Sequence, residues 1–64
     1  MSDFGKDVRK LLKQNGCYLV RQGKGDHQIW YSPLSDLNVT VDTKIKSRHT
    51  ANAILKQASI DIKF

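Results

Sequence analysis

The chain has 64 residues and a net charge of +5, from eleven Lys and Arg against six Asp and no Glu. That length predicts one small domain over residues 1–64 with a modest core. The sequence excludes a membrane-spanning helix, because no apolar run approaches the roughly 18 residues required. A single cysteine, Cys17, excludes an internal disulfide and a cysteine-rich zinc site. The positive charge favours a polyanion or an acidic protein as the partner. The N-terminus has no apolar signal-peptide core, so we expect a cytoplasmic protein.

An apolar stripe at helical spacing predicts that the chain begins with a helix. Its members are Phe4, Val8, Leu11 and Leu12. Ser2 or Asp3 is a suitable N-cap, and Gly16 suits the left-handed position after the last turn. The rest of this helix is expected to be basic, with Lys6, Arg9, Lys10 and Lys13 on its surface.

Three short strands are predicted next, over residues 17–21, 27–32 and 37–41, with turns at 22–26 and 33–36. Alternation places Tyr18 and Val20 on one face of the first strand, and Arg21 with Cys17 and Leu19 on the other. In the second strand, His27, Ile29 and Tyr31 share one face, and Gln28 and Trp30 share the opposite face. In the third strand, Leu37, Val39 and Val41 alternate with polar residues, which is typical of a half-buried strand.

Residues 42–49 are predicted to form a polar, basic connection that carries Lys44, Lys46 and Arg48. Thr50 is then expected to cap a second helix. The inward-facing residues of that helix would be Ala51, Ile54, Leu55 and Ala58. Ile60, Ile62 and Phe64 follow in a short tail and are candidates for packing on the core. The order α-β-β-β-α predicts an α+β fold, in which two helices cover one face of a three-stranded antiparallel sheet.

His27 is the candidate catalytic residue, since histidine exchanges a proton near neutral pH. It follows a glycine-rich, basic turn in which Lys24 is the nearest candidate for binding a phosphate. Gly25 allows the backbone to approach a phosphate closely. RNA can be cut without a metal when a base takes the proton of the 2′-hydroxyl and an acid protonates the leaving oxygen. We expect no metal or cofactor, because neighbouring Asp26 and His27 point to opposite faces of a strand and no second ligand lies at a suitable spacing.

Several of these residues also have ordinary structural interpretations. A histidine at a strand start is often only a surface residue, and helix lysines often form a solvated face. The basic run at Lys44, Lys46 and Arg48 is either a solvated loop or a phosphate-binding segment. Trp30 and Tyr31 either stack on unpaired bases or pack in the core or against a partner. His49 is expected to be solvated, and Cys17 to be a small buried side chain.

Four stretches, in this order and spacing, resemble the HicA family of toxin–antitoxin toxins. They are Gly5-Lys6-Asp7-Val8 with residues 11–16, Leu19-Val20-Arg21-Gln22, Gly25-Asp26-His27-Gln28-Ile29-Trp30, and Ala53-Ile54-Leu55-Lys56-Gln57-Ala58. The resemblance implies a fold like that of double-stranded-RNA-binding domains. In that fold the first helix contacts RNA, which would place Lys6, Arg9 and Lys10 at the RNA. The resemblance also implies a metal-independent mRNA endoribonuclease (an mRNA interferase) with His27 as the catalytic residue. It further implies a HicB-like antitoxin as the neutralising partner.

Two positions depart from the family pattern. Where the family often has Val-Pro-x-His after the third strand, this chain has Val41-Asp42-Thr43-Lys44, and Ser59 replaces a glycine after the second helix. The first departure affects any accessory role of that region. Two other functions stay open: a non-catalytic module that binds double-stranded RNA, and an interaction module whose basic surface meets an acidic protein.

Overall fold

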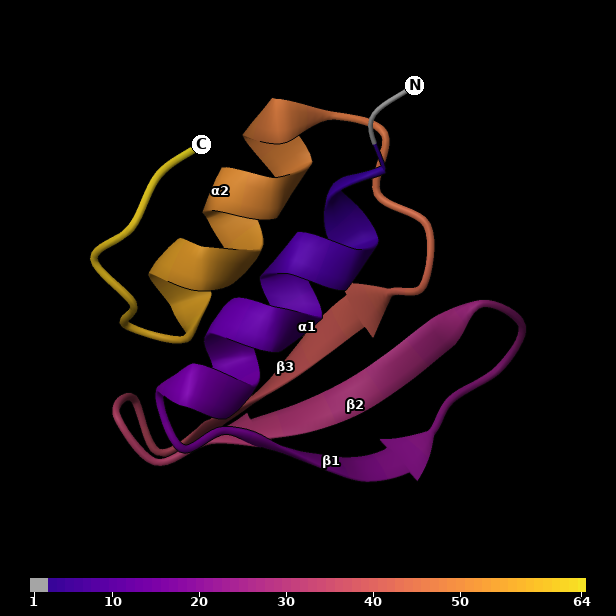
Figure 1. Ribbon diagram of the computed structural model, residues 1–64. Coiled ribbons are helices and arrows are strands. Elements are labelled where there is room, and N and C mark those ends of the chain that lie inside the picture. Colours follow the sequence, from indigo (N-terminus) through magenta and orange to yellow (C-terminus); the bar gives the residue numbers. More distant parts are fainter. Residues whose placement is uncertain (1–2) are drawn as a thin grey trace.

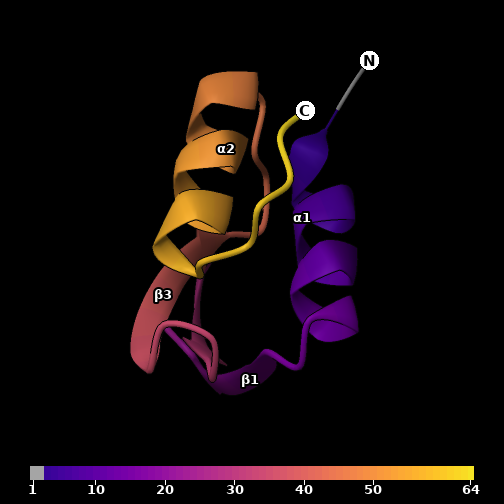
Figure 2. The same cartoon turned by 90° about the vertical axis from the view of Figure 1, so that its left-hand side faces the viewer.

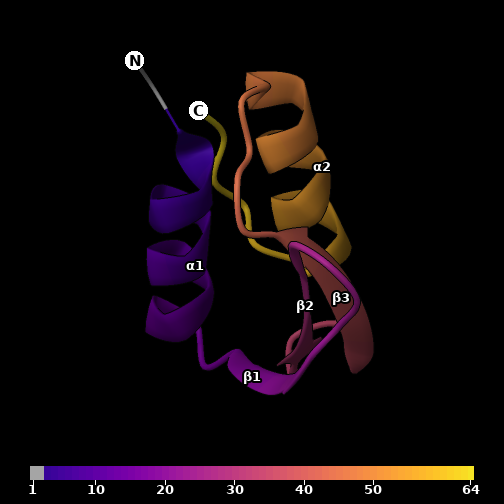
Figure 3. The same cartoon turned by 90° about the vertical axis from the view of Figure 1, so that its right-hand side faces the viewer.

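A computed structural model describes residues 3–64. Its elements are α1 (Phe4–Gln14), β1 (Tyr18–Gln22), β2 (His27–Ser32), β3 (Leu37–Asp42) and α2 (Arg48–Gln57). The strands form one antiparallel sheet in the order β1-β2-β3, and both helices lie across one face of it (Figure 1). The side views in Figures 2 and 3 show helices in one layer and strands in the other. The predicted α+β fold, with two helices on one face, is confirmed.

The start of α1 is held by the side chain of Asp3. Its carboxylate accepts hydrogen bonds from the backbone N–H of Gly5 (2.9 Å) and of Ile45 (3.0 Å). The bond from Gly5, then that from Ile45, lowers the pKa of Asp3 because both favour the charged form. Asp3 is therefore an N-cap, as predicted, and it also ties α1 to the loop after β3; Ser2 lies outside the described residues. Gly16 has the expected positive φ, +85°, just beyond the C-cap of the helix.

The sheet places each β2 side chain by its cross-strand partners. Trp30 lies opposite Val39 and is only 3% exposed, so this side of β2 faces the helices. His27, Ile29 and Tyr31 alternate with it and therefore lie on the open face, which confirms the prediction that these three share one face. The prediction for Arg21 is wrong: a bulge after Leu19 pairs Arg21 with Ile29 and moves it to the open face. A single extra residue in β1 is enough to reverse the alternation.

The start of α2 differs from the prediction. The N-cap is Ser47, not Thr50, and its hydroxyl accepts the backbone N–H of Thr50 at 3.4 Å. The helix therefore begins at Arg48, and His49 lies in its first turn rather than in a preceding loop. Serine and threonine are both good caps, so residue type cannot rank them. Buried Ile45, which anchors the loop just upstream, favours the earlier start.

The core lies between the sheet and the helix pair. Its fully enclosed side chains include Val8, Leu12, Val39, Val41, Ile45 and Leu55. The predicted inward residues of α2, namely Ala51, Ile54, Leu55 and Ala58, are all buried, and so is Cys17. In the tail, Ile60 is buried and Phe64 packs against Phe4 with ring centroids 5.1 Å apart. Ile62 instead stays 41% exposed, so it does not join the core.

Candidate functional site

His27 is the first residue of β2, at the point where the β1–β2 turn becomes strand. Its backbone closes that turn: Gly23 N–H donates to the carbonyl of His27 (2.8 Å), and His27 N–H donates to that of Lys24 (3.2 Å). A Cβ at residue 23 would lie only 3.2 Å from the His27 carbonyl oxygen, so glycine permits this close approach. The imidazole itself is 54% exposed, on the open face of the sheet. It is therefore accessible to a large ligand.

The partner of His27 is a carboxylate that the sequence analysis placed in a loop. Asp42 is the last residue of β3, directly opposite His27, and not the first residue of the connection. The two side chains meet with His27 Nδ1 2.7 Å from Asp42 Oδ1. An ionised carboxylate has no proton to donate, so the hydrogen on this contact belongs to Nδ1. The other ring nitrogen, Nε2, is then left to act on a ligand.

Three segments converge on this end of the sheet. Thr43 N–H, next to Asp42, donates to the carbonyl of Asp26 in the β1–β2 turn (2.7 Å). The guanidinium Nη1 of Arg9, on α1, donates to the carbonyl of Thr43 (3.1 Å). Phe4 N–H, at the start of α1, donates to the carbonyl of Ile45 (2.7 Å). Hydrogen bonds thus connect the β1–β2 turn, the β3–α2 loop and the first half of α1 at this end of the sheet (Figure 1). α1 lies on the covered face of the sheet, whereas the His27 side chain lies on the open face.

Most of the predicted RNA-binding residues lie on those three segments. Lys24 and Gly25 are exposed in the turn; Lys44 and Lys46 are exposed in the loop, and Arg48 at the start of α2. Lys6 and Lys10 are exposed on α1. Arg9 differs from these because it is half-buried and uses one N–H on the Thr43 carbonyl. Gly25 has φ +61° and open space around its Cα, which fits a turn that a ligand can approach.

The two candidates for stacking on bases, Trp30 and Tyr31, lie in different environments. Trp30 is part of the core, and its indole N–H donates to Gln28 Oε1 (3.1 Å), so it is not a surface for bases. Tyr31 lies on the open face with His27 and packs against Tyr18, with ring centroids 5.4 Å apart. Its hydroxyl is hydrogen-bonded to Asp36, which raises the pKa of Tyr31 because the bond favours the neutral phenol. Tyr31 is partly exposed and lies on the same face of the sheet as His27, four residues further along β2.

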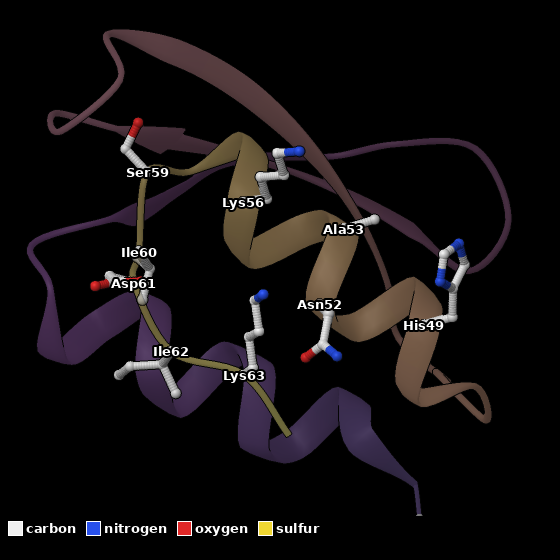
Figure 4. Close-up of a pocket in the computed structure, with 9 residues that line it drawn as sticks. All are labelled: His49, Asn52, Ala53, Lys56, Ser59, Ile60, Asp61, Ile62 and Lys63. Atoms are coloured by element: carbon white, nitrogen blue, oxygen red, sulfur yellow. The ribbon is translucent and has the colours of Figure 1, made fainter.

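His49 lies on α2, not on the pair of strands that carries His27 and Asp42. It lines a surface depression between α2 and the C-terminal segment, at the end near the first turn of α2 (Figure 4). Its neighbours there include Asn52, Lys56 and Lys63, and His27 is not among the lining residues. Within residues 3–64, no group of three or more metal-ligating side chains is found, and no helix is long and apolar enough to cross a bilayer.

Two features of the site were missed by the sequence analysis. Asp42 was named only as a departure from a family pattern, although continuing the alternation of β3 by one residue would have placed it in the strand. Its position opposite His27 depends on the β2–β3 register, which follows from the short turn at residues 33–36. The contact of Arg9 with Thr43 joins residues 34 apart, and no local pattern indicates it.

Comparison with known families gives one result that covers most of the chain. Residues 5–60 match the family described as "HicA toxin of bacterial toxin-antitoxin". No curated protein and no solved structure matches the chain. The matched range contains all of α1 except its first residue, the whole sheet, α2, and both members of the His27–Asp42 pair. The chain therefore belongs to the HicA family of toxins from bacterial toxin–antitoxin systems.

Proposed function

We propose that this toxin is an mRNA endoribonuclease in which His27 acts as the acid/base catalyst. The observation that carries the proposal is the environment of one imidazole. His27 is half-exposed, is held by Asp42, and lies at the end of the sheet where hydrogen bonds connect the β1–β2 turn, the β3–α2 loop and α1. A ring buried in the apolar core would have argued against this function. A carboxylate on one ring nitrogen orients the ring and leaves the other nitrogen free, which is what an acid/base catalyst requires.

The reaction needs no group beyond this chain and its substrate. The 2′-oxygen of a ribose attacks the adjacent phosphorus and loses its proton to the free nitrogen of His27, Nε2. The bond from phosphorus to the 5′-oxygen breaks, and that oxygen takes a proton from water or from the protonated ring. The products are a 2′,3′-cyclic phosphate and a 5′-hydroxyl. Positive groups beside the phosphate stabilise the charge on its non-bridging oxygens, and Lys24 and Lys44 flank the pair in sequence.

Binding is expected to use residues of the same three segments, together with Arg48 at the start of α2. These are Lys6, Arg9 and Lys10 on α1, Lys24 with Gly25 in the turn, and Lys44, Lys46 and Arg48 after β3. Phosphate contacts of this kind make affinity fall steeply with salt. Tyr31 is four residues along β2 from His27, about 13 Å in a strand, so it is placed to stack on a base near the cleaved bond.

The physiological partners follow from the same assignment. mRNA is the substrate, so the toxin acts in the cytoplasm. A HicB-like antitoxin would neutralise it by covering His27 and the cations around it. A small acidic antitoxin encoded beside the toxin would match its net charge of +5.

The test compares wild type with His27→Ala, and with His49→Ala as the matched control. His49 is also an exposed histidine, but it lies on α2 outside the site. Each purified protein is incubated with a structured mRNA in EDTA, at several salt concentrations. Fluorescence of Trp30, which is buried, reports that each variant is folded. Growth after induction in a host without the antitoxin is measured in parallel.

We expect wild type and His49→Ala to cut the RNA, leaving cyclic phosphate ends, and to stop growth. His27→Ala should bind RNA with similar affinity but cleave it about 10²–10⁴-fold more slowly, and growth should continue. Equal cleavage by His27→Ala would refute the catalytic assignment. Binding without any cleavage by the wild-type protein would instead support a non-catalytic RNA-binding module.

A further inference from the structure

Asp42 stands at a sequence position where the family often has a different residue, and the fold gives it a defined place. As the last residue of β3, it is the direct cross-strand neighbour of His27. Directly opposite side chains of an antiparallel pair lie on the same face, about 5 Å apart at their Cβ atoms. The register therefore brings the carboxylate to the imidazole without any long or flexible connection.

The backbone on both sides of the pair is fixed. Thr43 N–H, just after Asp42, donates to the carbonyl of Asp26, just before His27 (2.7 Å). The carbonyl of His27 accepts the N–H of Gly23 (2.8 Å), and the carbonyl of Thr43 accepts from Arg9 (3.1 Å). Neither residue can move along its strand without breaking these bonds. The backbone therefore keeps the two residues directly opposite each other.

The contact also determines which of the two ring nitrogens carries the hydrogen. At 2.7 Å, Asp42 Oδ1 lies at the short end of N–H···O distances, as expected for a bond to a charged acceptor. A carboxylate so placed retains the hydrogen on Nδ1 and leaves the lone pair of Nε2 free. It also limits rotation of a ring that is 54% exposed and would otherwise sample several orientations. Without this partner the proton would be shared between the two nitrogens, and only part of the protein would be ready to act.

We propose that Asp42 is the positioning residue of this toxin: its carboxylate holds His27 in the Nδ1–H form, so that Nε2 is the atom that takes the proton from the 2′-hydroxyl of RNA. This inference rests on the proposed function and adds to it the orienting residue and the reacting nitrogen. The proton on Nδ1 stays with the ring throughout. Asp42 touches neither the RNA nor the reacting atoms.

The negative charge of Asp42 allows two possible roles of this residue to be distinguished by their effects on KM and kcat. Asp42 is an acidic residue in a site for a polyanion, so its carboxylate repels the phosphates of the substrate. Were Asp42 only a surface charge, its removal would strengthen RNA binding and lower KM while kcat stayed the same. A positioning role predicts instead that kcat falls. KM is then unchanged or lower, so kcat is the quantity that distinguishes the two roles.

The first experiment measures single-turnover cleavage and RNA affinity for wild type, Asp42→Ala and Asp42→Asn. Asp61→Asn is the control, since it removes the same charge from an exposed position on the tail. Asp42→Ala should lose about 10–100-fold in kcat, which is less than the ~10⁴-fold loss at a buried protease triad because Asp42 is 41% exposed. Asp42→Asn, whose amide N–H can donate to Nδ1 and so favour the other tautomer, should lose at least as much kcat as Asp42→Ala. Asp61→Asn should match wild type.

The second experiment reads the tautomer directly, without RNA or turnover. Two-bond ¹H–¹⁵N correlation spectra are recorded near pH 8, where an ordinary histidine ring is neutral, with His27→Ala identifying the signal. Wild type should show His27 with its proton on Nδ1. Asp42→Ala should show a mixture of both forms, with the fluorescence of Trp30 unchanged.

Each result has a definite consequence. An unchanged tautomer in Asp42→Ala, or an unchanged kcat beside an inactive His27→Ala, overturns the positioning role and leaves the proposed function intact. Wild-type protein that does not cleave RNA, or His27→Ala that cleaves at the wild-type rate, overturns the proposed function and this inference with it. A lower kcat together with the tautomer change supports the proposal.

Discussion

Replacing Gly5 by alanine tests how tightly α1 is packed on the segment next to the site. Gly5 is buried in the first turn of α1 and has no positive φ. Alanine is the better helix former by roughly 0.8–1.0 kcal/mol, so helix propensity alone predicts stabilisation. A Cβ at this position would instead lie 2.5 Å from the carbonyl oxygen of Thr43 and 3.0 Å from Arg9 Nη1.

The size of the effect follows from that overlap. An ordinary contact between carbon and oxygen is about 3.4 Å, so the Thr43 carbonyl has to move by about 0.9 Å. It belongs to a backbone segment held by the hydrogen bonds of Thr43 and Ile45, and cannot rotate away like a side chain. Overpacking of this kind costs about 1–3 kcal/mol. After subtraction of the helix gain, we expect Gly5→Ala to destabilise the protein by up to about 2 kcal/mol.

The assay is urea unfolding followed by the fluorescence of Trp30, which is 3% exposed in the folded protein. A His27→Ala background is used so that the protein can be produced without arresting its host. A loss of this size is large for a 64-residue chain, whose total stability is expected to be about 3–10 kcal/mol. In thermal unfolding, the midpoint should fall by up to about 15 °C. Lys10→Ala, an exposed substitution on the same helix, should change stability by less than about 0.5 kcal/mol.

A stabilised Gly5→Ala protein would refute this reasoning. It would mean that α1 and the loop after β3 separate easily, and that helix propensity decides the outcome. The same result would weaken the view that α1 supports the backbone beside Asp42.

Two further predictions concern buried and capping polar groups. Ser32→Ala should cost about 1–3 kcal/mol in urea unfolding, since it leaves the buried carbonyl of Ala58 without the hydroxyl that now donates to it at 2.7 Å. Ser35→Ala should be neutral or slightly stabilising, because the buried hydroxyl of Ser35 has no hydrogen-bond partner within residues 3–64; equal losses for the two serines would contradict this argument. Asp3 has a pKa lowered below 3.8 in the folded state, so its contribution is present above that unfolded value and is lost as pH falls through the lowered one. Unfolding midpoints should therefore decline more steeply below about pH 4 in wild type than in Asp3→Asn, and parallel declines would disprove the role of this cap.

The elements of the fold were predictable because the signals for them are local. The apolar stripe from Phe4 to Leu12 indicated α1, and the alternation around Val39 indicated a half-buried strand. The same alternation placed His27 and Tyr31 on one face, and the glycines around Lys24 marked the turn. Such patterns depend only on the 3.6-residue and two-residue repeats of the backbone, so they are present in the chain before it folds.

The site was only partly predictable from local patterns. His27 stood out by its residue type and its position after a glycine-rich turn, and the resemblance to the HicA family gave it a role. Asp42 and the bulge that turns Arg21 to the open face depend on strand register, and the start of α2 at Ser47 depends on how Ile45 packs.

The sequence by itself determined the order of elements, the net positive charge and the candidate histidine, because each can be identified without knowing which distant residues meet. Only the tertiary structure decided which carboxylate meets that histidine and which segments are hydrogen-bonded to one another at that end of the sheet. Asp42 is 15 positions from His27, and Arg9 is 34 positions from Thr43. These pairs meet only because burial of one shared core fixes the strand register and holds α1 against the loop after β3.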